Sequence, residues 1–351
     1  MGMVDRKLHR VLVYGAGVVG SVYAARIWQA GFDTGILARG DRLRDLRDHG
    51  IVLQDRRSAK LTVAPVPPVA SLASDAGYDL AIIAVRRNQV EEILPVLSAA
   101  KGIRTFCFLV NTAAGYRSWN NAIGGDRLLP GFPGVAGIRQ GPVVRYTLLP
   151  AWLQPTTIAE PDGRRTPRLD AVCGLFQAAG FPTAIARDML SWLMCHVAVV
   201  SPLANAVYRS QGNAMSLAGS RPAIRLVVEA IREGLRVVRQ LGMAVAPGKL
   251  RLFEALPAPL LVSLFRWWIG SNHFQLVAGS HAAAAQTKCC TWHANSTSSF
   301  KNPTPAHRPS MSYSRRARRS TRAGNRHGAN GVQHAGFPVE LMRTAESHLR
   351  M

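Results

Sequence analysis

The sequence has no uninterrupted apolar run of the roughly 20 residues that a membrane-spanning helix needs. Its longest apolar stretches, 193–207 and 256–269, are interrupted by proline, polar or charged residues, namely His196, Pro202, Pro257, Pro259 and Arg266. A signal peptide is not expected either, because the apolar stretch after Arg6, Lys7 and Arg10 runs directly into a glycine motif without a small-residue cleavage site. We therefore expect no membrane partner.

Cysteine and acidic residues are both scarce. Five cysteines, scattered apart from the adjacent Cys289 and Cys290, do not form a disulfide framework, so the expected location is the reducing cytoplasm. Lysine and arginine outnumber aspartate and glutamate by 43 to 20, which alone suggests nucleic acid or an acidic membrane surface as a partner. Beyond Phe274, however, the acidic residues are only Glu340 and Glu346, so part of the excess charge belongs to the end of the chain.

The length and apolar content of the chain indicate two globular domains. With 351 residues, 48% of them hydrophobic, the sequence is long enough to bury two cores. From residue 10 to about 187, strand-like apolar runs alternate with helical patterns, which predicts an α/β domain over 1–187 with a Rossmann-type, doubly wound parallel sheet. The expected strands are 11–14, 35–38, 80–85, 105–110, 156–159 and 182–185, of which the last two complete the sheet at its far edge. The expected helices are 18–30, 43–48, which ends at Gly50, and 90–97.

After Asp188 the pattern becomes helical. One apolar helix is expected over 189–200, ending at Ser201 and Pro202, and another begins at Pro222 and ends before Gly242. Residues 188–285 are therefore predicted to form an all-helical C-terminal domain for substrate binding or dimerisation. From 286 to 351 the composition shifts to Ser, Thr, Arg, Pro and His without a sustained apolar period, which is typical of a basic, disordered tail.

A glycine motif lies between the first predicted strand and helix. Its six residues, G-x-G-x-x-G, are Gly15, Ala16, Gly17, Val18, Val19 and Gly20. The three glycines allow a tight turn, close approach of the backbone to a diphosphate and close packing of helix on strand, while the helix N-terminus offers free N–H groups. A chance glycine-rich turn is the alternative, but the strand before the motif and the helix after it favour a dinucleotide site.

The end of the second strand predicts which dinucleotide binds. An enzyme for NAD usually places an acid there, whereas this chain has Arg39, followed by Asp41 and Arg42. A guanidinium pairs well with a 2′-phosphate, so NADP(H) is the expected cofactor. Arg39 as an ordinary surface arginine remains the alternative.

Several motifs, taken in order, resemble the ketopantoate reductase family over residues 10–281. They are the glycine motif, Ala38-Arg39-Gly40, the strand that ends in Val85-Arg86 with Gln89, the strand that ends in Val110-Asn111, the segment Trp192-Leu193-Met194-Cys195-His196 with Ser201-Pro202, and Arg232-Glu233-Gly234. The family reduces 2-oxo acids, typically ketopantoate, by hydride transfer from NADPH. The resemblance implies that Val85 and Arg86 lie near the cofactor and that Asn111 contacts both the nicotinamide ribose and the substrate. Arg86 replaces the lysine that the family places there.

The family also places a catalytic lysine where this chain has Met194, and methionine can neither donate a proton nor stabilise a developing alkoxide. His196 is a candidate substitute, although two residues along a helix turn the side chain by roughly 200°. Ser201 is the polar residue predicted to share the face of position 194. The catalytic candidates are therefore Asn111, Ser201 and His196, with His196 as a core histidine left open.

The tail departs from the family, which has an amphipathic helix after His281. Regrouping plausible codons of 286–299 in a shifted frame permits a sequence with apolar residues at helical spacing, and the same regrouping of 306–313 permits a turn and the start of a helix. We therefore favour a frameshift, which makes the helical domain incomplete. A zinc site at His281, Cys289, Cys290 and His293 is disfavoured because adjacent cysteines suit tetrahedral geometry poorly, so no metal is expected.

These observations lead to one main hypothesis and two alternatives. The chain is expected to reduce a small, ketopantoate-like 2-oxo acid with NADPH, in the cleft between the two domains, within pantothenate biosynthesis. The first alternative is a catalytically inactive NADP-binding pseudo-reductase. The second is a binding protein with a basic, nucleic-acid-binding tail, which only the charge supports. Whether the chain forms a homodimer stays open.

Overall fold

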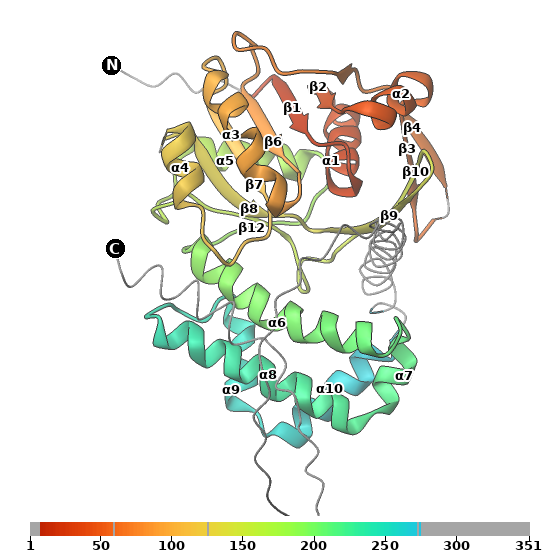
Figure 1. Ribbon diagram of the computed structural model, residues 1–351, viewed down its shortest axis with the longest axis vertical. Helices are drawn as coiled ribbons and strands as arrows, with labels where there is room; N and C mark the ends of the chain where they lie inside the picture. Colours follow the sequence, from red (N-terminus) through yellow and green to blue (C-terminus); the bar gives the residue numbers. More distant parts are fainter. Residues whose placement is uncertain (1–7, 59, 125, 272–273, 275–351) are drawn as a thin grey trace, which may run out of the picture.

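The computed structural model describes residues 8–58, 60–124, 126–271 and 274. A layered α/β part lies above a helical part in Figure 1, and the long helix α6 (Met189–Arg209) runs between the two. The fold is therefore an α/β sheet domain followed by helices, as the sequence predicted. The predicted tail over 286–351, and with it His281, Cys289, Cys290 and His293, lies outside the described residues.

The main sheet has eight strands in the order β12-β11-β8-β7-β6-β1-β2-β5. The six strands from β8 to β5 run parallel, while β11 pairs with β8 in the antiparallel direction and β12 then follows β11. The strands are β1 (Arg10–Tyr14), β2 (Asp33–Leu37), β5 (Pro68–Val69), β6 (Leu80–Ile83), β7 (Thr105–Leu109), β8 (Leu128–Phe132), β11 (Thr156–Ile158) and β12 (Thr183–Ile185). The last two strands lie at the far edge as predicted, but they make the sheet mixed rather than wholly parallel.

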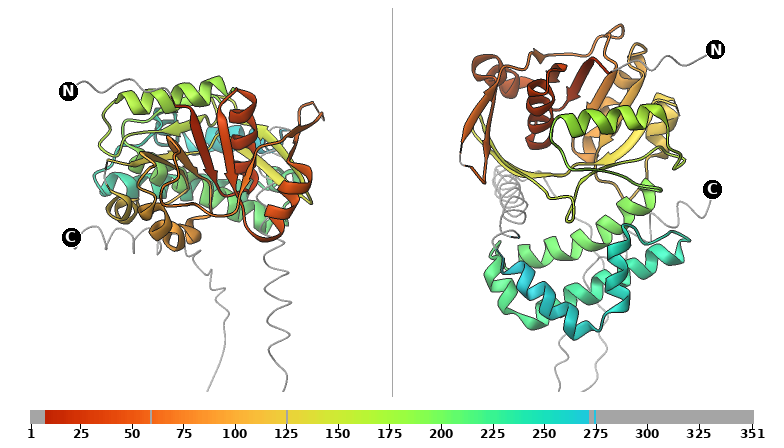
Figure 2. Two further views of the ribbon diagram at one scale, coloured as in Figure 1. Left: turned by 90° about the horizontal axis from the view of Figure 1, so that it is seen from above. Right: turned by 180° about the vertical axis from the view of Figure 1, so that it is seen from behind.

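Helices cover both faces of this sheet, which explains why its central strands are continuously apolar. Alternate residues of β1 point to opposite sides, so that Val11 and Val13 join one core while Leu12 and Tyr14 join the other. The helices α1 (Val18–Gln29) and α5 (Pro167–Ala178) pack on the first face and lie side by side in Figure 2. The helices α3 (Val90–Ala99) and α4 (Arg117–Ile123) pack on the second face. The sheet is thus doubly wound.

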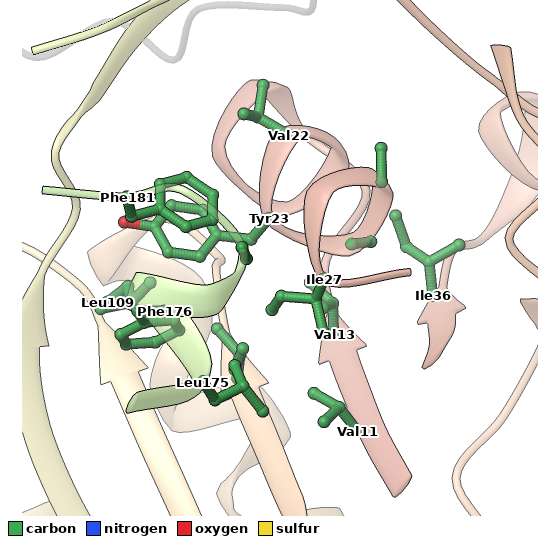
Figure 3. Packing of buried hydrophobic residues seen from close by; sticks show 14 of the residues in the cluster. Val11, Val13, Val22, Tyr23, Ile27, Ile36, Leu109, Leu175, Phe176 and Phe181 are labelled. Carbon is green, nitrogen blue, oxygen red and sulfur yellow. The ribbon is translucent and has the colours of Figure 1, made fainter. Parts of the chain in front are cut away.

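Aromatic rings fill the core between α1, α5 and the sheet (Figure 3). Tyr23 stacks on Phe181 with the ring centroids 4.1 Å apart and meets the edge of Phe176 at 5.4 Å. The Tyr23 hydroxyl lies 2.5 Å from Thr156 Oγ1, and the Gly134 amide donates to both oxygens at 3.3 Å. This buried network fixes α1, and with it the glycine motif at the N-terminus of α1, against the far edge of the sheet.

A second, four-stranded sheet was not predicted. Its order is β4-β3-β10-β9, and it packs against α1, beside which Figure 1 shows it. Its strands are β3 (Ile51–Asp55), β4 (Leu61–Ala64), β9 (Val135–Gln140) and β10 (Val143–Leu148). The short helix α2 (Gly40–His49), predicted over 43–48 with Gly50 as its end, leads from β2 into this sheet, and Gly50 has φ +66°.

The helical part differs from prediction in its first helix. Pro202 lies inside α6 rather than ending it, and the helix continues to Arg209, with Pro202 buried and with Leu203 and Val207 packed into the helical core. The other helices are α7 (Ala214–Gly219), α8 (Arg221–Gln240), α9 (Leu252–Ala255) and α10 (Ala258–Ile269). As predicted, Pro222 occupies the first turn of α8, whose N-cap is Ser220, and Gly242 follows its end with φ +74°.

By length and composition α6 also meets the requirement for a membrane-crossing helix, contrary to the expectation that no stretch would. Within the protein, however, 44% of its most apolar window is buried, and the core helix of a soluble protein meets the same requirement.

Candidate nucleotide and substrate site

The glycine motif forms a turn between β1 and α1 in which two glycines are required sterically. Gly15 has φ +109°, and a Cβ built on it would lie 2.7 Å from the carbonyl oxygen of Ala84. A Cβ on Gly20 would lie 1.8 Å from the carbonyl oxygen of Gly15, so α1 packs directly against the turn. Both glycines therefore maintain the shape of the turn without any ligand.

Gly17 is different, because the space around it is open. A Cβ there would meet nothing within 4 Å, and Gly17 is the N-cap of α1 with no side chain capping the helix. The first N–H groups of a helix have no partner within the helix, and the helix dipole makes this end attractive to anions. The turn thus leaves room at Gly17 for a group that the backbone amides of Val18, Val19 and Gly20 can hold.

The parallel strands bring the other predicted cofactor residues to the same edge of the sheet. The register pairs Tyr14 of β1 with Leu37 of β2 and with Ile83 of β6, so the glycine turn, Ala38 and Ala84 leave the sheet at one level. In β7, Phe108 pairs with Ile83, which places Asn111 level with Arg86. The predicted cofactor residues therefore follow one another along the carboxyl edge.

Arg39 lies at the end of β2, as predicted, and is the N-cap residue of α2. Its Nη2 donates to Tyr14 Oη at 2.9 Å, and its Nη1 lies 3.5 Å from Oε1 of Glu92 on α3. The side chain is 60% exposed, so its charge remains available to a ligand at this edge. Arg42 has a different environment, since its side chain is only 10% exposed.

Val85, Arg86 and Asn111 follow the central strands β6 and β7. Val85 is half-buried, whereas Arg86 and Asn111 are exposed. The backbone N–H of Arg86 donates to Oε1 of Gln89 at 3.1 Å, which holds the turn into the next helix. The structure thus brings these three residues together with the glycine turn.

The residues predicted on α6 are distributed differently from the expectation. Met194 is 1% exposed and lies in the core that α6 forms with α8 and α10, not beside the sheet. His196 is half-buried and faces the sheet instead: its ring stacks on Trp192 with an interplanar angle of 9° and lies 4.1 Å from the ring of Phe132, at the carboxyl end of β8. Position 194 is thus not where a proton donor would reach the edge of the sheet.

This placement corrects the sequence hypothesis in one respect and supports it in another. His196 and Met194 do occupy different faces of the helix, as the helical rotation predicted, but His196 is the one near the sheet. Ser201 is half-buried, one turn beyond Val197 on the same helix. The alternative interpretation of His196 as a core histidine stays a prediction, since its half-buried ring packs against both Trp192 and Phe132.

Tyr116 was missed by the sequence analysis. It lies in the loop after β7, between Asn111 and α4, and packs against the cluster of Ala159, Met189, Trp192 and Leu193, where α6 meets the sheet. Burial and the nearby carboxylate of Asp188 raise the pKa of Tyr116 to about 12. Its ring therefore ties the Asn111 loop to α6, and only its position just after a buried strand could have suggested it.

The described residues contain no group of three His, Cys, Asp or Glu side chains close enough to hold a metal ion.

Comparison with known proteins agrees with this arrangement. The family model described as "Ketopantoate reductase PanE/ApbA" matches residues 11–153, which include the glycine turn and the strand ends. Residues 11–153 belong to the ketopantoate reductase family. The family is one of oxidoreductases, so the matched segment carries an oxidoreductase domain.

Solved structures extend the similarity in fold beyond the matched segment. The 2-dehydropantoate 2-reductase of Geobacter metallireducens GS-15 is 16% identical with a TM-score of 0.59, over 78% of this chain and 99% of that chain. The 2-dehydropantoate 2-reductase of Methylococcus capsulatus is 14% identical with a TM-score of 0.56, over 83% and 99%. D-mandelate dehydrogenase, solved with NADH and anilino(oxo)acetate, is 15% identical with a TM-score of 0.59, over 78% and 82%. At these identities the similarity establishes the fold.

Proposed function

We propose that this chain binds NADPH and reduces a small, ketopantoate-like 2-oxo acid to the 2-hydroxy acid. The observation that carries the proposal is the glycine turn, in which Gly15 and Gly20 are held by steric necessity while Gly17 faces open space. A glycine without a packing reason, at the uncapped start of a helix, is what close approach of a diphosphate requires. The residues present therefore fit a dinucleotide.

Each part of the site then has a role. The amides from Gly17 to Gly20 hold the diphosphate, and the exposed guanidinium of Arg39 pairs with the 2′-phosphate. Val85, Arg86 and Asn111 lie beside the bound cofactor, along the carboxyl edge of the sheet in the direction of β8. The nicotinamide, when bound, supplies the hydride. In this proposal residues 1–187 bind the nucleotide and residues 188–285 complete the substrate site.

His196 is the proposed proton donor to the carbonyl oxygen, with Asn111 as a polar partner of the substrate. The helix α6 contains no lysine between Met189 and Arg209, so a lysine on this helix cannot perform the step. An imidazole can hold a proton and donate it to a carbonyl oxygen, and that of His196 lies next to the sheet. Whether the acid is ketopantoate itself or another 2-oxo acid is decided by turnover with a panel of such acids.

A matched pair of glycine variants tests nucleotide binding. Gly17→Ala adds a methyl group where the protein has room but the diphosphate should lie, so we expect unchanged thermal stability and at least a tenfold loss of NADPH affinity in a fluorescence titration. Gly174→Ala, in α5, likewise adds a methyl group to open space and serves as the control with unchanged affinity. Equal NADPH affinity of the Gly17→Ala variant and the wild type would contradict the proposal.

Two further variants separate cofactor choice and catalysis. Arg39→Ala should weaken NADPH by about tenfold or more and leave NADH nearly unchanged, because only NADPH carries the 2′-phosphate. His196→Gln should retain NADPH affinity and lose turnover with ketopantoate by 10²–10⁴-fold, the usual contribution of a positioned acid.

An inactive nucleotide-binding protein is the second candidate function. The observation that favours it is that position 194, which the family resemblance assigns to the catalytic lysine, holds a methionine buried in the helical core. NADPH binding without turnover of any 2-oxo acid, in both wild type and His196→Gln, would establish this alternative.

A further inference from the structure

Arg42 places its largely buried side chain directly behind the glycine turn. It belongs to the first turn of α2, yet its side chain turns inward and is only 10% exposed. Its Nε donates to the carbonyl oxygen of Ala16 at 3.2 Å, and its Nη2 donates to Ser21 Oγ at 3.1 Å. Its Nη1 reaches the carbonyl oxygen of Pro142, in the turn between β9 and β10, at 3.5 Å. One guanidinium thus joins the glycine turn, α1 and the second sheet.

The contact with Ala16 fixes the orientation of one peptide unit. The Ala16 carbonyl also accepts a hydrogen bond from Ser21 Oγ at 3.3 Å, so two donors hold it from the protein side. In a planar trans peptide the C=O and the following N–H point in opposite directions. With the Ala16 carbonyl held inward, the Gly17 N–H points outward, into the space that is open around Gly17.

The charge of Arg42 is only partly compensated. Its nearest carboxylate is Asp45 at 3.8 Å, and Asp45 is shared with Arg139 at 3.5 Å. Burial, followed by the positive charge of Arg139, lowers the pKa of Arg42, while Asp45 acts in the opposite direction. Two guanidiniums therefore share one carboxylate behind the turn, and an anion bound at the front of the turn would relieve this imbalance.

We propose that Arg42 is a positioning residue for the diphosphate: it fixes the Ala16–Gly17 peptide so that the Gly17 N–H faces the ligand, and it places positive charge behind that peptide. This inference deepens the proposed function and depends on it. It also gives different roles to two arginines that lie three residues apart in the sequence. Arg39, exposed at the edge, selects the 2′-phosphate, whereas Arg42, buried behind the turn, serves the diphosphate that NADPH and NADH share.

The test is a calorimetric titration of NADPH, NADH and adenosine 2′-monophosphate against the full chain and its variants. Arg42→Met, which keeps the length of the side chain and removes its charge and donors, should weaken both coenzymes by the same factor, about tenfold or more, the scale of a lost charged hydrogen bond. It should leave adenosine 2′-monophosphate, which has no diphosphate, within about twofold of the wild type. Arg42→Lys keeps the charge and should recover part of the loss for both coenzymes. Arg39→Ala is the matched control and should weaken NADPH and adenosine 2′-monophosphate but not NADH.

The inference is overturned if Arg42→Met binds both coenzymes like the wild type, if it weakens NADPH alone, or if all three ligands weaken equally, which indicates general damage to the fold. Should Arg42→Met fail to fold, Arg42→Lys carries the test through an equal, smaller loss for NADPH and NADH. A folded wild type that binds neither coenzyme overturns the proposed function, and this inference with it. If the wild type binds both coenzymes and Arg39→Ala behaves as expected, but the Arg42 variants do not, the inference alone is overturned.

Discussion

Restoring a lysine at position 194 should damage this protein rather than activate it. Met194 is 1% exposed in the apolar core between α6, α8 and α10, so Met194→Lys would place an ammonium where nothing solvates it. Burial of this kind lowers the pKa of a lysine by up to 3–5 units, and each unit corresponds to about 1.36 kcal/mol. At neutral pH the loss cannot exceed the gap between pH 7 and the unfolded pKa of about 10.4, so we expect about 4–5 kcal/mol, a large part of the total stability of most domains.

The pH dependence of that loss provides a specific signature. The folded-state pKa of the new lysine lies below its unfolded value of about 10.4, so between the two values the unfolded state binds more protons. Stability of the variant should consequently rise with pH relative to the wild type, by up to about 1.4 kcal/mol per pH unit in that window.

Urea denaturation at neutral pH and near pH 9 measures this effect, with Met194→Leu as the volume-conserving control, expected within about 1.5 kcal/mol of the wild type. A folded Met194→Lys with wild-type stability and raised turnover of a 2-oxo acid would refute the placement of this position in the core.

Three other predictions concern stability. At the amino edge of the sheet, burial alone would raise the pKa of Asp79, but hydrogen bonds from the Arg10 and His9 amides and from the Arg104 guanidinium outweigh burial and hold the pKa below its usual value. The ionised Asp79 therefore stabilises the fold above its unfolded pKa, and this contribution is lost as the pH falls. In Asp79→Asn, urea denaturation should show a smaller loss of stability toward pH 3 than in the wild type. Tyr23→Phe and Thr156→Val should each cost about 1–3 kcal/mol in urea denaturation, and the double variant should cost less than the sum, because the two hydroxyls share one buried network; additive costs would contradict this. Gly20→Ala should lower the melting temperature by several degrees in circular dichroism, unlike Gly17→Ala, because its Cβ collides with the Gly15 carbonyl; equal melting temperatures would show that the turn can adjust.

The sequence predicted the elements whose pattern has one explanation. The central strands β6 and β7 are buried on both faces, so a continuous apolar run sufficed to identify them. The glycine turn was equally accessible, since the spacing of its glycines follows from contacts within a few residues and one neighbouring strand. The edge position of β11 and β12 was also correct, whereas their reversed direction depends on the long connection after β8 and leaves no local signal.

The second sheet and the placement of α6 could not be predicted for physical reasons. The strand β10 pairs with β3, which lies about ninety residues earlier, and neither has enough apolar length to indicate a strand alone. In α6 both sides are apolar, so the hydrophobic pattern could not tell which side meets the sheet and which meets α8. The proline at position 202, a usual signal for the end of a helix, is accommodated because it is buried in the helical core.

Because α6 packs both against the sheet and into the helical core, the two parts of the chain are not expected to be stable as separate fragments. Its first turns carry Met189, Trp192 and Leu193 onto Ala159, while its other side supplies much of the helical core. The helix α6 is thus part of both cores and not a flexible linker between them. A chain divided after residue 187 would leave both fragments with an exposed apolar surface. We expect such fragments to aggregate on expression, and a nucleotide-binding fragment extended through Arg209 would still expose the side of α6 that packs into the helical core.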